Sequence, residues 1–126
     1  MEKQIINTNS APAPIGPYNQ AVFVNNTLYI SGQICLDATT GNLKNRDIQD
    51  ETHQVMQNLK VILHEAGMSF ADVVKTTIFI TDMNQFSEIN EIYAKYFNGN
   101  FPARETVQVA ALPRMVNVEI SMIAAK

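Results

Sequence analysis

Two runs near the C-terminus alternate apolar and polar residues, and this alternation constrains the fold more than any other feature of the chain. The runs cover residues 101–113 and 116–124. A period of two is typical of β-strands that bury one face and leave the other less apolar. Pro102 stands where a strand can begin, because the first position needs no N–H donor. The sequence therefore predicts two consecutive strands, interrupted by the segment 112–115.

Each predicted strand carries a charged residue that is a candidate for a binding or catalytic role. Arg104, near the start of the first strand, bears a planar fork of donors suited to bidentate capture of a carboxylate. Glu119 lies in the second strand, whose apolar face is formed by Val116, Val118, Ile120, Met122 and Ala124. Glu119 therefore points to the opposite face. The chain thus carries a carboxylate-binding cation and a strand-embedded carboxylate on consecutive strands.

The segment 20–36 predicts a β-hairpin. Its two halves alternate apolar and polar residues and meet at Asn25 and Asn26, which favour a tight turn. The apolar face of the second half carries Leu28, Ile30, Ile34 and Leu36. The other face would carry Tyr29, Ser31, Gln33 and Cys35. Gly32 falls on the apolar side, where the lack of a side chain permits close approach of another element.

Apolar residues recur at helical spacing in two further segments. The segment 48–66 is preceded by Asp47, a favourable N-cap, and followed by Gly67, a favourable stop. The segment 85–97 carries a second apolar stripe, and Asn90 lies beside it. Two amphipathic helices are therefore expected.

A strand expected at 73–81 separates the two helices. The order strand, strand, helix, strand, helix, strand, strand predicts an α+β fold in which two helices cover one face of one mixed sheet. The whole chain, 1–126, is expected to form one domain. The uncovered face would carry Ser31, Cys35, Glu119 and Ile123, a half-apolar surface that calls for a partner. The sequence therefore predicts an oligomer.

Composition argues against several classes of protein. The net charge of −3 and the pI near 5.2 give no general attraction to nucleic acid or anionic lipid. The single cysteine excludes an intramolecular disulfide and agrees with a reducing compartment. His53 and His64 fall on a polar helix face at a spacing unlike that of metal-binding pairs, so no metal or other cofactor is expected. Because the sequence has neither signal-peptide character nor a membrane span, we expect a cytoplasmic protein without nucleic-acid or membrane partners.

Four separated motifs resemble the RidA (YjgF) family of enamine/imine deaminases. The C-terminal motif comprises PAR at 102–104, LP at 112–113 and VEI at 118–120. The other three are IGPYNQA at 15–21, SGQI at 31–34, and VKTT at 74–77 followed by Phe79 and Asp82. Two positions depart from the family pattern, since Glu105 stands where members usually carry a small residue and Cys35 where they often carry a proline. These departures bear on substrate choice.

The resemblance implies a chorismate-mutase-like protomer and a homotrimer, with a central barrel of sheets and three pockets at the subunit clefts. On this basis we expect Arg104 to bind the substrate carboxylate. Glu119, on the neighbouring strand or subunit, would position and activate a water. The residues expected to line the pocket are Tyr18, Ser31, Gly32, Asn90 and Thr106.

Three functions remain open at this point. The chain is a deaminase that hydrolyses imines of 2-oxo acids, a non-catalytic trimer that binds small carboxylates such as 2-oxo acids, or an RNA-directed translation inhibitor or ribonuclease. The acidic net charge and the lack of a catalytic histidine pair or basic groove argue against the third. Glu119 separates the first two, because binding an anion does not require a nearby carboxylate.

Strand alternation gives expectations for the two departures from the family pattern. Glu105 should point away from Arg104, toward solvent or a neighbouring subunit. Cys35 shares a predicted face with Ser31 and so would approach the pocket, although a small buried hydrophobe is the commoner state of a lone cysteine.

Overall fold

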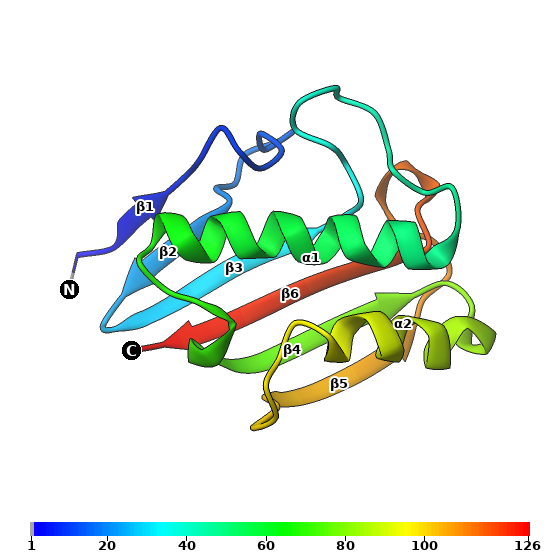
Figure 1. The fold of residues 1–126 in the computed structure, drawn as a ribbon. Coiled ribbons are helices and arrows are strands. Elements are labelled where there is room, and N and C mark those ends of the chain that lie inside the picture. The colour runs from blue at the N-terminus through cyan, green and yellow to red at the C-terminus, as the bar shows by residue number, and fades with distance from the viewer. Residues whose placement is uncertain (1) are drawn as a thin grey trace.

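The computed structural model describes residues 2–126, which form one mixed six-stranded sheet with two α-helices on one of its faces (Figure 1). The strands are β1 (Gln4–Ile6), β2 (Ala21–Val24), β3 (Thr27–Gln33), β4 (Val73–Ile80), β5 (Ala103–Gln108) and β6 (Val118–Ala125). The helices are α1 (Ile48–Glu65) and α2 (Phe86–Ala94), with short 3-10 helices η1 (Phe70–Asp72), η2 (Met83–Gln85) and η3 (Pro113–Met115). The α+β prediction is confirmed, and β1 is a strand that the sequence pattern did not reveal.

The sheet has the strand order β1-β2-β3-β6-β4-β5. β4 and β5 are parallel, with α2 in their connection, and the other neighbouring strands are antiparallel. β6 is therefore central, and β4 separates it from β5. β5 and β6, which follow one another in the sequence, are therefore not neighbours in the sheet.

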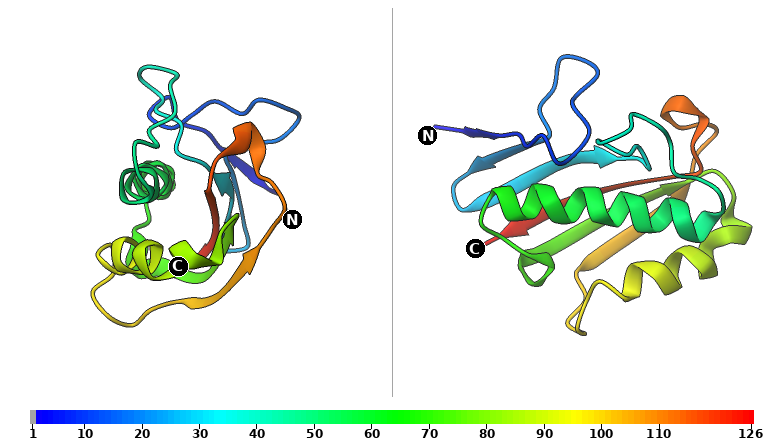
Figure 2. Two further views of the ribbon diagram at one scale, coloured as in Figure 1. Left: turned by 90° about the vertical axis from the view of Figure 1, so that its right-hand side faces the viewer. Right: turned by 45° about the horizontal axis from the view of Figure 1, so that its top comes forward.

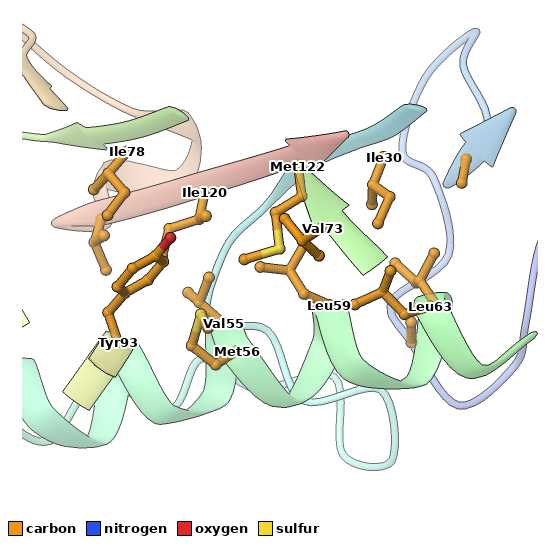
Figure 3. Close-up of a cluster of buried hydrophobic side chains, with 14 of the residues drawn as sticks. Ile30, Val55, Met56, Leu59, Leu63, Val73, Ile78, Tyr93, Ile120 and Met122 are labelled. Carbon is orange, nitrogen blue, oxygen red and sulfur yellow. The ribbon is translucent and has the colours of Figure 1, made fainter. Parts of the chain in front are cut away.

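The hydrophobic core lies between the helices and the face of the sheet that they cover (Figure 2). Side chains of α1 meet those of β4 and β6 there, since α1 runs along the middle of the sheet (Figure 3). The labelled core residues are Ile30, Val55, Met56, Leu59, Leu63, Val73, Ile78, Tyr93, Ile120 and Met122. Within residues 2–126 no element covers the opposite face of the central strands, which we call the open face.

The predicted boundaries of α1 and of the hairpin are confirmed by their geometry. The Asp47 side chain accepts a hydrogen bond from the backbone N–H of Asp50 at 2.7 Å, which caps α1. Gly67 follows the helix with φ of +73°, a left-handed conformation that favours glycine. Asn25 and Asn26 have φ of 54° and 61°, as a two-residue hairpin turn of type I′ requires.

A β-bulge in β3 changes the alternation that the sequence predicts. Ile30 pairs with Met122 and Gln33 pairs with Ile120, so β3 takes one more residue than β6 between these pairs. Gln33 consequently joins the buried face, and Cys35 packs in the core. The prediction that both lie on the opposite face is therefore wrong, because an extra residue reverses the parity of every residue after it.

Buried side-chain amides hold the loops against the sheet. Gln20 donates from Nε2 to the carbonyl oxygens of Thr8 at 3.0 Å and Pro12 at 2.9 Å. Asn58 of α1 donates from Nδ2 to two carbonyl oxygens in the segment after β3, at 3.0 and 2.9 Å. These contacts satisfy backbone groups that regular strands would otherwise pair.

A buried carboxylate joins the first turn of α1 to the start of β6. Glu51 is fully buried and accepts hydrogen bonds from Asn117 N at 2.7 Å, Asn117 Nδ2 at 2.8 Å and Val118 N at 3.0 Å. An acidic residue in the first turn of a helix, where Glu51 lies, is favourable by itself. The contacts of Glu51 also set the position at which β6 enters the sheet, immediately before Glu119.

Neither α-helix of the described chain combines the length and the apolar character that crossing a membrane requires.

We expect Glu51→Ala to lower the free energy of unfolding by about 3 kcal/mol, because it leaves one buried backbone N–H, one partly buried backbone N–H and one side-chain amide without acceptors. Chemical denaturation at one fixed protein concentration measures this loss. Glu65→Ala is the control, since Glu65 is exposed at the other end of the same helix and its loss should change stability by no more than about 0.5 kcal/mol. Equal effects of the two substitutions would contradict the assignment.

Candidate functional site

Arg104 lies on the helix-covered side of the sheet, at the edge strand β5. It pairs in register with Thr76 of β4, a fully buried residue of that face. Its guanidinium carbon lies 5.2 Å from the centroid of the Tyr93 ring and 5.6 Å from that of Phe86. Among residues 2–126 the guanidinium forms no ion pair. Two aromatic rings of α2 thus hold a cation whose charge no carboxylate neutralises.

The surroundings of Arg104 fix this arrangement. Tyr93 donates its hydroxyl to Thr76 Oγ1 at 3.0 Å, and burial raises the pKa of the Tyr93 phenol, so the ring stays neutral and oriented. A hollow of about 300 Å³ opens beside the guanidinium and is lined also by Asn90 and Phe101. We call Asn90, Tyr93, Phe101 and Arg104 the Arg104 cluster.

Thr106 lies two residues beyond Arg104 and so on the same face of β5. Its hydroxyl oxygen is buried and has no hydrogen-bond partner within residues 2–126. Buried hydroxyls are usually paired. The Thr106 hydroxyl is therefore an unused donor on the same face of β5 as Arg104.

Glu119 lies on the open face of the sheet. Its strand neighbours Val118 and Ile120 are fully buried on the helix side, and it pairs with Phe79 of β4. The carboxylate lies directly over Gly32, where a Cβ atom would come within 2.8 Å of Glu119 Cδ. A side chain at position 32 would therefore require the Glu119 carboxylate to move. The close approach predicted at Gly32 is confirmed, although the bulge places it on the open face.

Tyr18 and Ser31 belong to the same region as Gly32. Tyr18 is half exposed and lines a small hollow together with Gly32. Ser31 donates its hydroxyl to the carbonyl oxygen of Asn19 at 2.7 Å and its N–H to that of Gln20 at 2.9 Å. Ser31 therefore ties the loop that carries Tyr18 to β3. We call Tyr18, Ser31, Gly32 and Glu119 the Glu119 cluster.

The two clusters do not meet within one protomer. Arg104 points to the helix-covered face, Glu119 points to the open face, and β4 lies between their strands. Of the two arrangements expected, with Glu119 on a neighbouring strand or on a neighbouring subunit, the first is excluded within one protomer, because β5 pairs with β4 and not with β6. A second subunit is the remaining way to bring the two groups together.

The two departures from the family pattern have different environments. Glu105 points away from Arg104, as predicted, and its carboxylate meets Lys75 Nζ at 2.8 Å on the open face. The hydrogen bond and charge of Lys75 lower the pKa of Glu105. Cys35 is fully buried, and this burial raises the pKa of its thiol to about 11. Of the two states expected for Cys35, the structure shows the buried hydrophobe and not the approach to the pocket, since the bulge turns the side chain into the core.

The histidines make no metal-binding cluster in the part of the chain that the structure describes. No group of three or more His, Cys, Asp or Glu side chains is placed to hold a metal ion there. His53 instead has its Nδ1 atom 2.8 Å from the hydroxyl of Tyr96, a contact between α1 and the segment that follows α2.

The sequence analysis did not identify the aromatic rings that hold Arg104. Phe86 and Tyr93 both belong to the predicted apolar stripe of α2, which indicated only that they face the sheet. A signal was present in their positions one heptad apart, since residues at this spacing share a helix face. The helical pattern does not show that β5 pairs with β4, and this pairing brings Arg104 beneath Phe86 and Tyr93.

Comparison with known proteins agrees with this architecture. The family model described as Endoribonuclease L-PSP matches residues 8–126. A RutC family protein of Pyrococcus horikoshii is 49% identical over 124 residues, covering 98% of each chain. A 2-iminobutanoate/2-iminopropanoate deaminase of Mus musculus is 52% identical over 122 residues, covering 97% of this chain and 90% of the relative.

Two solved structures share both the fold and much of the sequence. A Rid-family protein of Yersinia pestis has a TM-score of 0.96 at 49% identity, covering 99% of this chain and all of the other. The E. coli protein TdcF, solved with bound serine, has a TM-score of 0.94 at 42% identity, covering 98% of each chain.

The mixed sheet with both helices on one face defines a protomer with the chorismate-mutase-like fold. Within that class, the matches over nearly the whole chain identify the family. The chain belongs to the RidA (YjgF) family, whose model carries the L-PSP description.

We expect Glu119→Gln to stabilise the protein at neutral pH. Burial raises the pKa of Glu119, so ionising this carboxyl costs more in the folded than in the unfolded state. The increase in the free energy of unfolding should be full above the folded-state pKa of Glu119. It should vanish as the pH falls below the ordinary carboxyl pKa of about 4.3. Unfolding free energies measured between pH 8 and pH 4 test this. Glu91→Gln, which removes the same charge from an exposed position of α2, should not reproduce this pattern.

Proposed function

We propose that this protein is a deaminase that hydrolyses enamine and imine intermediates, of the 2-aminoacrylate and 2-iminobutanoate type, to 2-oxo acids and ammonia. The observation that carries the proposal is the free guanidinium of Arg104, held between two aromatic rings beside a hollow. Such a group is a receptor for a substrate carboxylate. The name of the mouse relative and the serine bound to TdcF, itself a carboxylate, support this assignment.

We propose further that each active site forms between two subunits of a homotrimer, with Arg104 from one subunit and Glu119 from the next. The open face carries the half-exposed apolar residues Tyr29 and Val74, and a surface of this kind favours burial against another copy of the chain. Packing of open faces would bring the Glu119 cluster of one subunit toward the edge strand of another. Asn90 and Thr106 would contribute from the Arg104 side, and Tyr18, Ser31 and Gly32 from the Glu119 side.

The chemistry then follows from positioned charge. Arg104 holds the carboxylate by two parallel hydrogen bonds, which fixes the C2 atom of the imine near Glu119. Glu119 accepts a proton from a water as the water oxygen bonds to C2 of the protonated imine and the C=N electron pair moves to nitrogen. The protonated Glu119 then returns this proton to the nitrogen of the carbinolamine. As the C–N bond breaks and ammonia leaves, Glu119 takes the proton of the C2 hydroxyl, the carbonyl forms, and this proton passes to the departing ammonia. A carboxyl with a raised pKa suits both steps near neutral pH.

No cofactor is needed for this reaction, because water is a sufficient nucleophile toward a protonated imine carbon. Activity should therefore survive exhaustive chelation. We infer that all 126 residues act as one domain and that the protein works in the cytoplasm, where a lone cysteine agrees with a reducing compartment.

The main alternative is a trimer that binds 2-oxo acids without catalysis. It uses Arg104 in the same way but gives Glu119 no role. An RNA-directed activity, which the description of the family model names, would require a cationic surface along a strand of RNA, and the chain has a net charge of −3.

Two substitutions separate these functions. Arg104→Ala should abolish both deaminase activity and carboxylate binding. Glu119→Gln should lower turnover by about 10²–10⁴-fold while binding persists, because it removes only the general base. The assay is the release of 2-oxo acid from an imine generated by a dehydratase, with and without a chelator. If the unmodified protein binds 2-oxo acids through Arg104 but gives no acceleration over spontaneous hydrolysis, the non-catalytic function is correct. Cleavage of RNA by the same preparation would favour the RNA-directed function.

Subunit mixing tests whether the site is shared. Arg104→Ala and Glu119→Gln chains refolded together in equal amounts should recover up to about one quarter of the unmodified activity, because random trimers then contain that share of clefts with both intact groups. The same variants mixed without refolding are the control and should show no gain. Failure to recover activity in oligomers shown to be mixed would mean that each site lies within one subunit.

A further inference from the structure

A second hollow, of about 470 Å³, lies on the helical side of the protomer and shares no lining residue with the hollow beside Arg104. Its walls come from the C-terminal half of α1, from η1, and from the segment 95–100 that connects α2 to β5. In Figure 1 the green turn before β4 and the yellow loop after α2 lie beneath that end of α1. Its size is within the range of about 300–1,000 Å³ that is usual for small-molecule sites.

Within residues 2–126 the hollow is lined by two lysines and a histidine and by no acidic side chain. Lys60 and His64 are one turn apart on α1, and Lys95 follows α2. Within residues 2–126 neither lysine forms an ion pair. The carboxylate of Asp72, at the end of η1, accepts a hydrogen bond from Ser69 N at 2.9 Å. The positive charge is therefore local and unneutralised, although the chain as a whole carries a net charge of −3.

Aromatic rings and asparagine side chains also line the hollow. Phe70 packs edge-on against Tyr96 and Phe97, with ring centroids 5.5 and 5.4 Å apart. The Tyr96 hydroxyl is fixed by its contact with His53, so the ring is already oriented. Asn100, an exposed residue of the lining, adopts a left-handed φ of 49°.

We propose that this hollow is a second ligand site, which binds a phosphate monoester attached to a planar heterocycle. Lys60 and Lys95 suit a phosphate dianion because each ammonium is a point charge with three donors. The heterocycle would lie against Phe70 and Tyr96, where ring contacts are favourable. The site is independent of the proposed deaminase activity, since it uses none of the residues of the Arg104 and Glu119 clusters.

Three probes separate the parts of such a ligand. Adenosine 5′-monophosphate carries both the ring and the phosphate, adenosine carries only the ring, and inorganic phosphate carries only the anion. Titration followed by calorimetry should show saturable binding of the monophosphate and at least about tenfold weaker binding of the other two, because each lacks one set of contacts. Binding of inorganic phosphate as tight as that of the monophosphate would overturn the role of the ring.

The matched variants locate the binding. The double substitution Lys60→Gln and Lys95→Gln should weaken binding of the monophosphate by at least about tenfold, because two charge-assisted contacts are lost. The pair Lys3→Gln and Lys44→Gln removes the same charge elsewhere and should leave binding unchanged. Arg104→Ala should also leave it unchanged. Binding that survives the double substitution of Lys60 and Lys95 and is lost in Arg104→Ala would assign the monophosphate to the Arg104 hollow and overturn the proposal, as would no saturable binding below about 5 mM.

Discussion

The strict alternation along β6 is the constraint on which the rest of the molecule depends. Val118, Ile120 and Met122 are buried against the helices, and β6 pairs on both sides with antiparallel strands. A slip of one residue would exchange the apolar face for the one that carries Glu119. The same register that builds the core therefore fixes a partly buried carboxylate on the open face, which no helix of residues 2–126 covers.

The bulge in β3 shows how a local irregularity serves the geometry around that carboxylate. One extra residue between Ile30 and Gln33 brings Gly32 beneath Glu119 and turns Cys35 into the core. Burial then raises the thiol pKa to about 11, so Cys35 is an unreactive packing residue at neutral pH. A larger residue at 32 would have to displace the Glu119 carboxylate, which lies directly over Gly32.

Arg104 is held by aromatic rings, whose contacts orient the guanidinium and leave its charge free to bind a ligand. Aromatic faces orient a guanidinium without supplying the negative charge that would compete with a ligand. The only carboxylate next to it in sequence, Glu105, is drawn to Lys75 on the other face of the sheet. Alternation along β5 thus separates the cation from its neighbouring anion and keeps Arg104 available. Glu51 has a comparable structural role at β6, since its three hydrogen bonds place the strand that carries Glu119.

Local periodicity in the sequence predicts the elements and their faces wherever it is unbroken. The period-two runs, the Asn25 and Asn26 turn and the capped helix after Asp47 established an α+β sheet with one uncovered face, and the separated motifs indicated the family. The tertiary structure alone decided the rest. A period of two says which face a residue takes but not which strand lies beside it, so nothing local showed that β4 separates β5 from β6. The bulge at Ser31 and Gly32 likewise depends on pairing with β6, nearly ninety positions along the chain. Long-range register therefore placed Arg104 and Glu119 on opposite faces of the sheet.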